Sequence, residues 1–324
     1  MLDSESPQYV SRANIEGLLS QLERLPGQPR CGFFGPDSVT WQVNRECGIF
    51  LGAGRAALLQ LAHPWVAASL AHHSNLLNDA IGRFHSTFHV VYTMLFGSRA
   101  QAMAASRQLY ARHTGIRGEL PRTIGAHPRG EQYQANEVAA LRWVYATLVD
   151  SAVLAYEFVM PALSREEREQ YYAENKRLAT LCGIPPEALP EDWTAFTQYF
   201  AEMIESPLLG VDEDGRALGH SVLSGVGTWI RPPGWYRALT AFWMPPRLRA
   251  DFALPFGARE QASLLRATRW LPRLYPRIPR ALRLVGPFYE AEARLRGRSP
   301  GPLTLRNNRF WMGQPRLLYP QLGE

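Results

Sequence analysis

Seven of the eight histidines in this chain of 324 residues lie between Gly54 and Asp150. Neutral imidazole is a common ligand of transition metals and of haem iron. The same segment reads as four consecutive helix-like blocks, because its apolar residues recur at helical spacing. A histidine-rich helical centre indicates a candidate redox site.

A polar stripe is expected on the helix predicted over residues 80–96. At 100° per residue, Arg83, Ser86 and Thr87 share one face, and His85 and His89 lie on the opposite face. An Arg and a Thr one turn apart on a mostly apolar face need a polar or anionic partner. Haem propionate, an oxygen species or a carboxylate would serve. An acidic side chain of the protein, with Thr87 bonded to its own helix, is the simpler and more frequent alternative.

His113 ends the next predicted helix, at the edge of an apolar stripe that includes Leu109 and Tyr110. This position suits an axial haem ligand that leaves the other side of the iron open. Capping of backbone carbonyls beside Gly115 explains the residue equally well. Both interpretations stay open at this point.

The other histidines give weaker signals. His63 precedes Pro64, which places it at a bend between two helices. His85 and His89 have i, i+4 spacing without an intervening glutamate, and such a pair is more often packing or surface. Neighbours His72 and His73 point in different directions, so at most one joins a site. A non-haem metal centre that uses some of these five histidines is a further alternative.

A long apolar run over residues 143–163 contains Asp150 and Glu157, each costly inside a bilayer. We therefore predict a helix buried in protein rather than a membrane span. Asp150 must then be neutral or paired, with Arg55 or Arg83 as candidate partners. Tyr145, in the same run, offers a phenol to a bound ligand, although an aromatic residue in a core helix usually serves packing alone.

The pattern of apolar residues and breakers predicts an all-α fold, since no alternating strand pattern of useful length is found. Predicted helices include 80–96, 99–112, 131–160 and 164–181, with a loop or lid over 118–130 and mostly loop over 207–235. We divide the chain into an irregular N-terminal arm (1–45) that contains a short helical patch near Ile15 to Leu25, a helical core (46–210) and a C-terminal extension packed on the core (211–324).

The charge balance argues against nucleic acid as a partner. The net charge is only +6, and 34 of the 35 basic residues are arginines, which fits a compositional bias. The N-terminus is acidic and polar, unlike a secretory signal, and Cys31, Cys47 and Cys182 show no disulfide or zinc spacing. We expect a cytoplasmic protein. Peripheral membrane contact stays open, although the arginines between 266 and 283 are expected to form a solvated face whose apolar residues pack on the core.

Several motifs occur together in a recognisable order. They are Ala53-Gly54-Arg55-Ala56, His63-Pro64, His73-Ser74, Arg83 with Thr87, His113 with Gly118, and Trp143 to Ser151. With this order and spacing, about half of the chain, residues 46 to 210, resembles the MpaB and rubber-oxygenase (latex clearing protein) family.

The resemblance implies a globin-like core and haem b, with His113 as the proximal and metal ligand. It implies that Arg83 and Thr87 act over the distal face as catalytic and cofactor-binding residues, and we add His63 and Tyr145 as candidate cofactor contacts. The implied reaction uses dioxygen to cleave carbon–carbon double bonds of an apolar, isoprenoid or alkenyl, substrate.

Two positions depart from the family pattern. Ser86 stands where rubber oxygenase has a lysine, and Tyr145 stands where many relatives have a histidine. The substrate and the cleavage reaction therefore do not follow from the motifs alone. A non-catalytic protein that binds haem or an apolar ligand is the alternative function.

Overall fold

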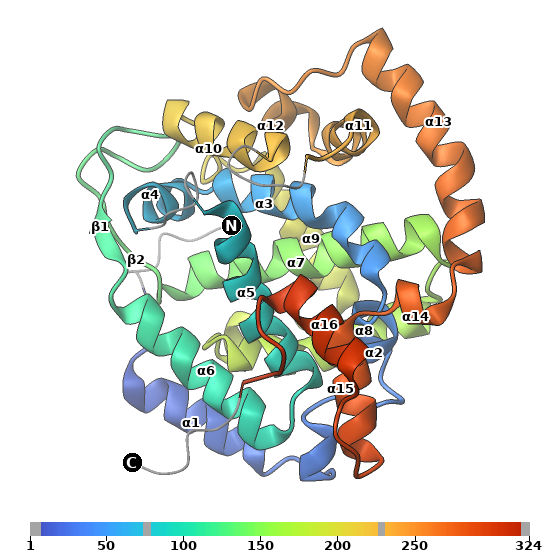
Figure 1. Ribbon diagram of the computed structural model, residues 1–324. Coiled ribbons are helices and arrows are strands. Elements are labelled where there is room, and N and C mark those ends of the chain that lie inside the picture. The colour runs from blue at the N-terminus through green and yellow to red at the C-terminus, as the bar shows by residue number, and fades with distance from the viewer. Residues whose placement is uncertain (1–7, 74–78, 226–230, 319–324) are drawn as a thin grey trace.

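The computed structural model is almost entirely helical, which confirms the predicted all-α class (Figure 1). The structure describes residues 8–73, 79–225 and 231–318. The α-helices of its first half are α1 (Arg12–Glu23), α2 (Val39–Asn44), α3 (Ala53–Leu61), α4 (Pro64–His73), α5 (Ala80–Phe96), α6 (Arg99–Thr114) and α7 (Val138–Val159). Those of its second half are α8 (Arg165–Leu181), α9 (Trp193–Glu205), α10 (Glu213–Ser224), α11 (Gly234–Trp243), α12 (Pro246–Asp251), α13 (Ala258–Leu274), α14 (Arg280–Arg283), α15 (Gly286–Leu295) and α16 (Pro302–Met312).

Short elements complete the fold. Four 3-10 helices link the longer helices: η1 (Pro29–Cys31), η2 (Cys47–Gly52), η3 (Pro186–Ala188) and η4 (Tyr275–Arg277). Strands β1 (Arg117–Glu119) and β2 (Gln132–Gln134) form an antiparallel pair in which Gly118 faces Tyr133. This hairpin replaces part of the predicted loop, and β2 occupies residues that we had assigned to the long helix.

Helix α7 runs through the middle of the molecule, with α3 and η2 on one side and α2 and α8 on another (Figure 1). Among the described residues it is the one helix whose length and composition would suffice to span a bilayer. Thirteen of its 22 residues are nevertheless buried by neighbouring elements. The prediction of a helix buried in protein is therefore confirmed.

An ion pair fastens α3 to α7. The Nη1 atom of Arg55 lies 2.5 Å from Oδ2 of Asp150, and it donates to Oγ of Ser151 at 2.7 Å. The Nε atom of the same guanidinium donates to the carbonyl of Trp243 at the end of α11. Of the two partners proposed for Asp150, the structure selects Arg55. One buried side chain thus joins three helices.

Local signals set most helix ends as predicted. Ser98 caps α6 and Ser164 caps α8, each accepting a hydrogen bond from the backbone three residues on. Pro64 begins α4, so that His63 lies at the bend after α3. Gly97 follows the last residue of α5. The short turn at Gly97 and Ser98 makes α5 and α6 a helical hairpin.

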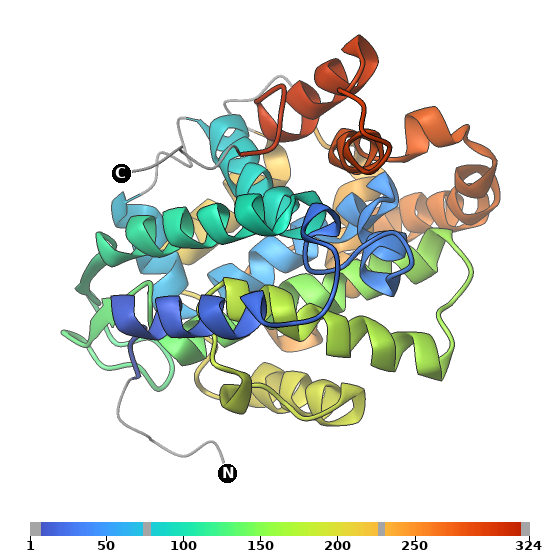
Figure 2. The same cartoon turned by 90° about the horizontal axis from the view of Figure 1, so that it is seen from below.

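Two segments are more regular than predicted. Helix α1 confirms the short helical patch predicted near residues 15–25, whereas α2 lies in a part of the N-terminal arm predicted to be irregular, and the indole of Trp41 in α2 is fully buried. The prolines of that region fall between the helices, where they do not interrupt hydrogen bonds. Helix α10 lies in the predicted loop, and Asp212 caps it. In Figure 2, α1 crosses the lower face of the molecule.

The C-terminal helices are attached to the core through a buried carboxylate. Glu46 is 1% exposed, forms an ion pair with Arg283 at 2.9 Å, and accepts a hydrogen bond from the hydroxyl of Tyr275. The same hydroxyl accepts from the backbone N–H of Gly48. All three cysteines are free thiols, as their spacing predicted.

Replacing Asp150 with alanine should lower the free energy of unfolding by about 3 kcal/mol, because the buried guanidinium of Arg55 would lose its counter-charge. Urea denaturation measures the change. The control is Arg107→Ala, which breaks the exposed pair with Glu16 and should cost less than about 1 kcal/mol. Equal losses in the two variants would contradict the role given to Asp150.

Candidate functional site

Helices α5 and α6 diverge from their shared turn at Gly97 and Ser98 (Figure 1), and the view from below agrees (Figure 2). Arg83 lies near the start of α5 and His113 near the end of α6, so both belong to the open end of this hairpin. Side chains from the two helices meet there. The predicted polar stripe of α5 thus faces the helix that carries His113.

Arg83 and Thr87 form a local pair on α5. The Nη1 atom of Arg83 donates to Oγ1 of Thr87 at 3.0 Å, and that hydroxyl donates to the backbone carbonyl of Arg83 at 3.0 Å. The simpler alternative predicted this hydrogen bond from the Thr87 hydroxyl to the backbone of its own helix. The acidic partner of that alternative is not found, since within the described residues no carboxylate lies within 4 Å of Arg83. Burial, together with the charge of Arg112, lowers the pKa of Arg83.

Arg112 brings a second guanidinium to the same place. Its Nη1 atom donates to Oγ of Ser86 at 2.6 Å and so links α6 to α5. Arg112 does not belong to the motifs from which the site was predicted. Its position next to His113, opposite the polar stripe of α5, is the signal that would have identified it.

His113 is held as a neutral imidazole. Its burial, reinforced by the nearby charges of Arg83 and Arg112, lowers the pKa of the ring to about 4. The Nδ1 atom is buried and has no hydrogen-bond partner. The carbonyl-capping alternative predicted a bond from the ring to the backbone, and none is found in the described part of the chain. A neutral ring with an unused nitrogen is able to bind a metal ion.

The charge at this end of the hairpin is one-sided. The positive charges of Arg83 and Arg112 help to lower the pKa of His113, and the charge of Arg112 helps to lower the pKa of Arg83. Ser86 and Thr87 add only neutral polar groups. In the described part of the chain neither guanidinium has a carboxylate within 4 Å, so the two form a site for an anionic group.

A cluster of aromatic rings covers another side of α5. Phe84 and Phe88 of α5 lie 4.5 Å apart between ring centroids, and Phe88 lies 4.8 Å from Phe50. Phe50 also stacks on Trp311 of α16 at 4.3 Å. At 100° per residue, Phe88 lies nearly opposite the polar stripe. These partly exposed rings therefore pack α5 against η2 and α16.

The periodicity of α5 predicted that His85 and His89 lie on the face opposite the polar stripe. This face contacts the C-terminal segment. The ring of His85 forms a hydrogen bond with the carbonyl of Phe310, and the ring of His89 forms one with the carbonyl of Arg316. His72 and His73 bind the hydroxyl of Tyr133 and the carbonyl of Arg117. Among the described residues, no three or more His, Cys, Asp or Glu side chains are placed to hold a metal ion. These four histidines thus have structural contacts.

His63 belongs to a separate buried cluster. Its ring lies 5.3 Å from that of His127 and 6.0 Å from that of Trp65. Glu131 bonds Nδ1 of His127 at 2.7 Å and accepts from the indole of Trp65. Burial, with a smaller effect of His127, lowers the pKa of His63 to about 3. The structure therefore brings His63 together with His127, and not with His113.

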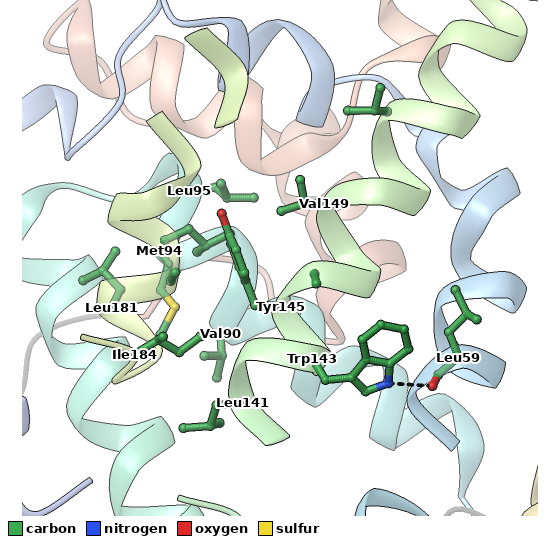
Figure 3. Close-up of a cluster of buried hydrophobic side chains, with 14 of the residues drawn as sticks. Leu59, Val90, Met94, Leu95, Leu141, Trp143, Tyr145, Val149, Leu181 and Ile184 are labelled. Atoms are coloured by element: carbon green, nitrogen blue, oxygen red, sulfur yellow. Dashed lines mark hydrogen bonds between the residues drawn. The ribbon is translucent and has the colours of Figure 1, made fainter. Parts of the chain in front are cut away.

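Tyr145 points into the apolar core (Figure 3). Its ring lies near Leu95 and Val149, whereas Trp143 points to the other side of α7 and bonds the carbonyl of Leu59 at 2.9 Å. Leu95 is twelve residues along α5 from Arg83, or roughly 18 Å at the helical rise. The phenol is buried without a hydrogen-bond partner, and burial raises its pKa. Tyr145 is thus placed away from the open end of the hairpin.

Comparison with known proteins identifies one family. Residues 41–274 match the family described as the catalytic domain of ER-bound oxygenase mpaB/B' and rubber oxygenase. The match runs past residue 210 into the segment that we had assigned to the C-terminal extension. No curated protein and no solved structure matches the chain.

Replacing Arg83 with methionine should raise the free energy of unfolding of the haem-free protein by about 1 kcal/mol, because a buried and unpaired charge is removed. The matched control is Arg55→Met, which leaves Asp150 without its partner and should destabilise the protein. Thermal or urea denaturation of both variants gives the comparison. A loss of stability in Arg83→Met as large as in Arg55→Met would show that Arg83 has a counter-charge.

His63 should make the protein less stable in acid. Below pH 6.5 the ring takes up a proton in the unfolded chain, but in the folded chain it stays neutral until about pH 3. The free energy of unfolding therefore falls as the pH drops through this window, and linkage gives about 2 kcal/mol between pH 7 and pH 5. Urea denaturation at both pH values should show a smaller fall for His63→Gln. Equal falls for the two proteins would disprove the assignment.

Proposed function

The chain belongs to the mpaB and rubber-oxygenase family, whose matched region is an oxygenase catalytic domain, and on this premise we propose that it is a haem b-dependent oxygenase. Its substrates would be dioxygen and an apolar molecule of the isoprenoid or alkenyl class. The observation that carries the proposal is the neutral ring of His113, with an unpaired buried nitrogen, at the open end of the α5–α6 hairpin.

The residues at this place fit haem b in charge and in polarity. His113 would hold the iron, because a neutral imidazole is the usual protein ligand of haem b in oxygen-binding proteins. Among the described residues, Arg83 and Arg112 have no carboxylate partner, and they would offset the negative charge of the propionates. Leu109, one turn before His113 on α6, offers an apolar contact to the porphyrin. Bound haem would supply the activation of dioxygen.

The side chains of α5 would orient the reactants. The guanidinium of Arg83 is already fixed by its hydrogen bond to the hydroxyl of Thr87, so its remaining N–H groups can donate to developing negative charge without a large reorganisation. Val90, one turn beyond Thr87 on the same face of α5, is buried, and this apolar packing would limit the access of water and so strengthen these hydrogen bonds. In this way a positively charged stripe can stabilise negative charge that develops during the oxidation of an apolar substrate.

Ser86 changes the chemistry of the stripe relative to rubber oxygenase, where a lysine stands at this position. In this chain, Arg112 reaches the hydroxyl of Ser86 from the facing helix. Positive charge is thus supplied to the same place by a different element. A guanidinium stays protonated under all physiological conditions, so it acts as a fixed charge and not as a proton donor.

The proposed reaction needs no external reductant. Cleavage of one carbon–carbon double bond by one molecule of dioxygen forms two carbonyl groups, and each receives one oxygen atom. The electrons of the broken carbon–carbon double bond all enter the two new carbonyl groups.

The alternative function is a carrier that binds haem or an apolar ligand without turnover.

The His113→Ala variant should lose haem, because the iron would lose its proposed protein ligand. The wild-type protein reconstituted with hemin should show a Soret band, and the variant should show that of free hemin. His85→Ala is the matched control, since His85 lies on the same hairpin but contacts the carbonyl of Phe310. Normal haem in His113→Ala would disprove the ligand assignment, and the spectra need no substrate.

Oxygen uptake separates the two functions. With an isoprenoid substrate, the haem-loaded wild-type protein should consume dioxygen and form carbonyl products, whereas a carrier would bind the substrate without consumption. Arg83→Met should lower the rate roughly a hundredfold, as removal of one hydrogen-bond donor to developing charge typically does. Unchanged turnover in that variant would remove Arg83 from the mechanism.

A further inference from the structure

A single segment near the C-terminus holds an unusual share of the charge. Residues 261–289 contain six arginines and no aspartate, glutamate or lysine. The net charge of the whole chain is +6, so the remaining residues balance one another. The positive charge of this protein is therefore concentrated in α13, η4 and α14. These arginines are Arg266, Arg269, Arg273, Arg277, Arg280 and Arg283.

Large apolar side chains are exposed along the same segment. Of the nine that are exposed among the described residues, five lie between Leu265 and Leu282. They are Leu265 (59%), Trp270 (40%), Leu274 (52%), Ile278 (38%) and Leu282 (73%). The expected apolar side of this region does pack on the core, through Leu264, Ala267 and Leu271 on the inner face of α13. The five exposed side chains lie outside that inner face.

The geometry of α13 places the two kinds of side chain side by side. The helix lies at the outer edge of the molecule (Figure 1), where it packs on α11. At 100° per residue, Arg266, Arg269 and Arg273 form a row directly opposite the buried face. Leu265 lies on one shoulder of this row, and Trp270 and Leu274 lie on the other. Arg266, Arg269, Trp270, Arg273 and Leu274 together line a shallow surface depression.

Most of these arginines have no acidic partner. Arg283 is engaged by the buried Glu46. In the parts of the chain that the structure describes, none of the other five forms an ion pair within 4 Å. Arg273 and Arg277 bond backbone carbonyls one turn earlier on their own segment. The guanidinium groups thus remain available to an anionic surface.

We propose that the face formed by α13, η4 and α14 docks on an anionic lipid bilayer. Arginines would contact lipid phosphates, while the exposed Trp, Leu and Ile side chains would enter the boundary between headgroups and acyl chains. Nucleic acid fits less well, because the aliphatic side chains would gain nothing from a phosphate backbone. A second copy also fits less well, because self-association would bring one arginine row against another.

Vesicle flotation tests this proposal with the haem-loaded full chain. The wild-type protein should float with vesicles of phosphatidylcholine and phosphatidylglycerol at low salt, and much less with phosphatidylcholine alone or at high salt. The triple variant Arg266→Gln, Arg269→Gln, Arg273→Gln should lower the partition coefficient roughly a hundredfold, given the usual contribution of each basic residue near such a surface. Leu274→Ser with Leu282→Ser should lower it roughly tenfold.

Matched controls change the same residue types elsewhere. Arg12→Gln, Arg24→Gln, Arg129→Gln removes three other exposed arginines, and Leu303→Ser replaces a leucine that is 83% exposed on α16. Both should float as the wild type does. Failure of the wild type to float with anionic vesicles at low salt would overturn the proposal, as would equal loss in test and control variants.

Two other outcomes would assign the face differently. Binding of a short DNA duplex that the arginine variant abolishes, without flotation, would indicate nucleic acid. A dimer that only the leucine variant dissociates in light scattering would indicate self-association. Haem absorbance should be the same in all variants, so the flotation result does not depend on the proposed oxygenase chemistry.

Discussion

The ion pair between Arg55 and Asp150 is the constraint on which the rest of the fold depends. Charges this deep are tolerated only when they are paired and hydrogen-bonded, and here the guanidinium also engages Ser151 and the carbonyl of Trp243. These contacts fix α3 and α11 on the central helix α7. The motif residues around Arg55 and in the Trp143 to Ser151 stretch therefore form the framework of the fold, separate from the residues proposed to bind haem.

Arg83 shows the opposite use of the same side chain. Arg55 is buried and Arg83 is partly buried, but within the described residues the guanidinium of Arg83 contacts the hydroxyl of Thr87 and a like-charged neighbour in place of a carboxylate. A protein that retains an unpaired buried cation gives up stability at that place. Such a cost is understandable at a site that receives an anionic group, and the neutral ring of His113 beside it is what a haem-binding site requires.

Positive charge is also unevenly distributed over the outer surface of the protein. Apart from residues 261–289, acidic and basic side chains balance, while α13 and the segment after it combine arginines with exposed apolar residues. An enzyme whose substrates are long and apolar would find them at or in a membrane. The proposed docking face would hold the protein at the membrane, and the proposed haem site would accept apolar chains from it. The two would use separate residues.

The sequence by itself determined the helical class, most helix ends and the two faces of α5. These features follow from local rules: Ser98 and Ser164 cap the helices that follow them, Pro64 forces a bend, and a repeat of 3.6 residues separates Arg83 from His85. The candidate ligand His113 and its neighbours on α5 also came from the sequence, through motif order.

Only the tertiary structure decided which side chains meet. It paired Asp150 with Arg55 rather than Arg83, joined His63 to His127, and turned Tyr145 toward Leu95. It placed Arg112 beside Ser86, and it left Leu274 and Leu282 in solvent. Such contacts link residues far apart in the chain, and their geometry depends on how whole helices pack. No local pattern contains that information.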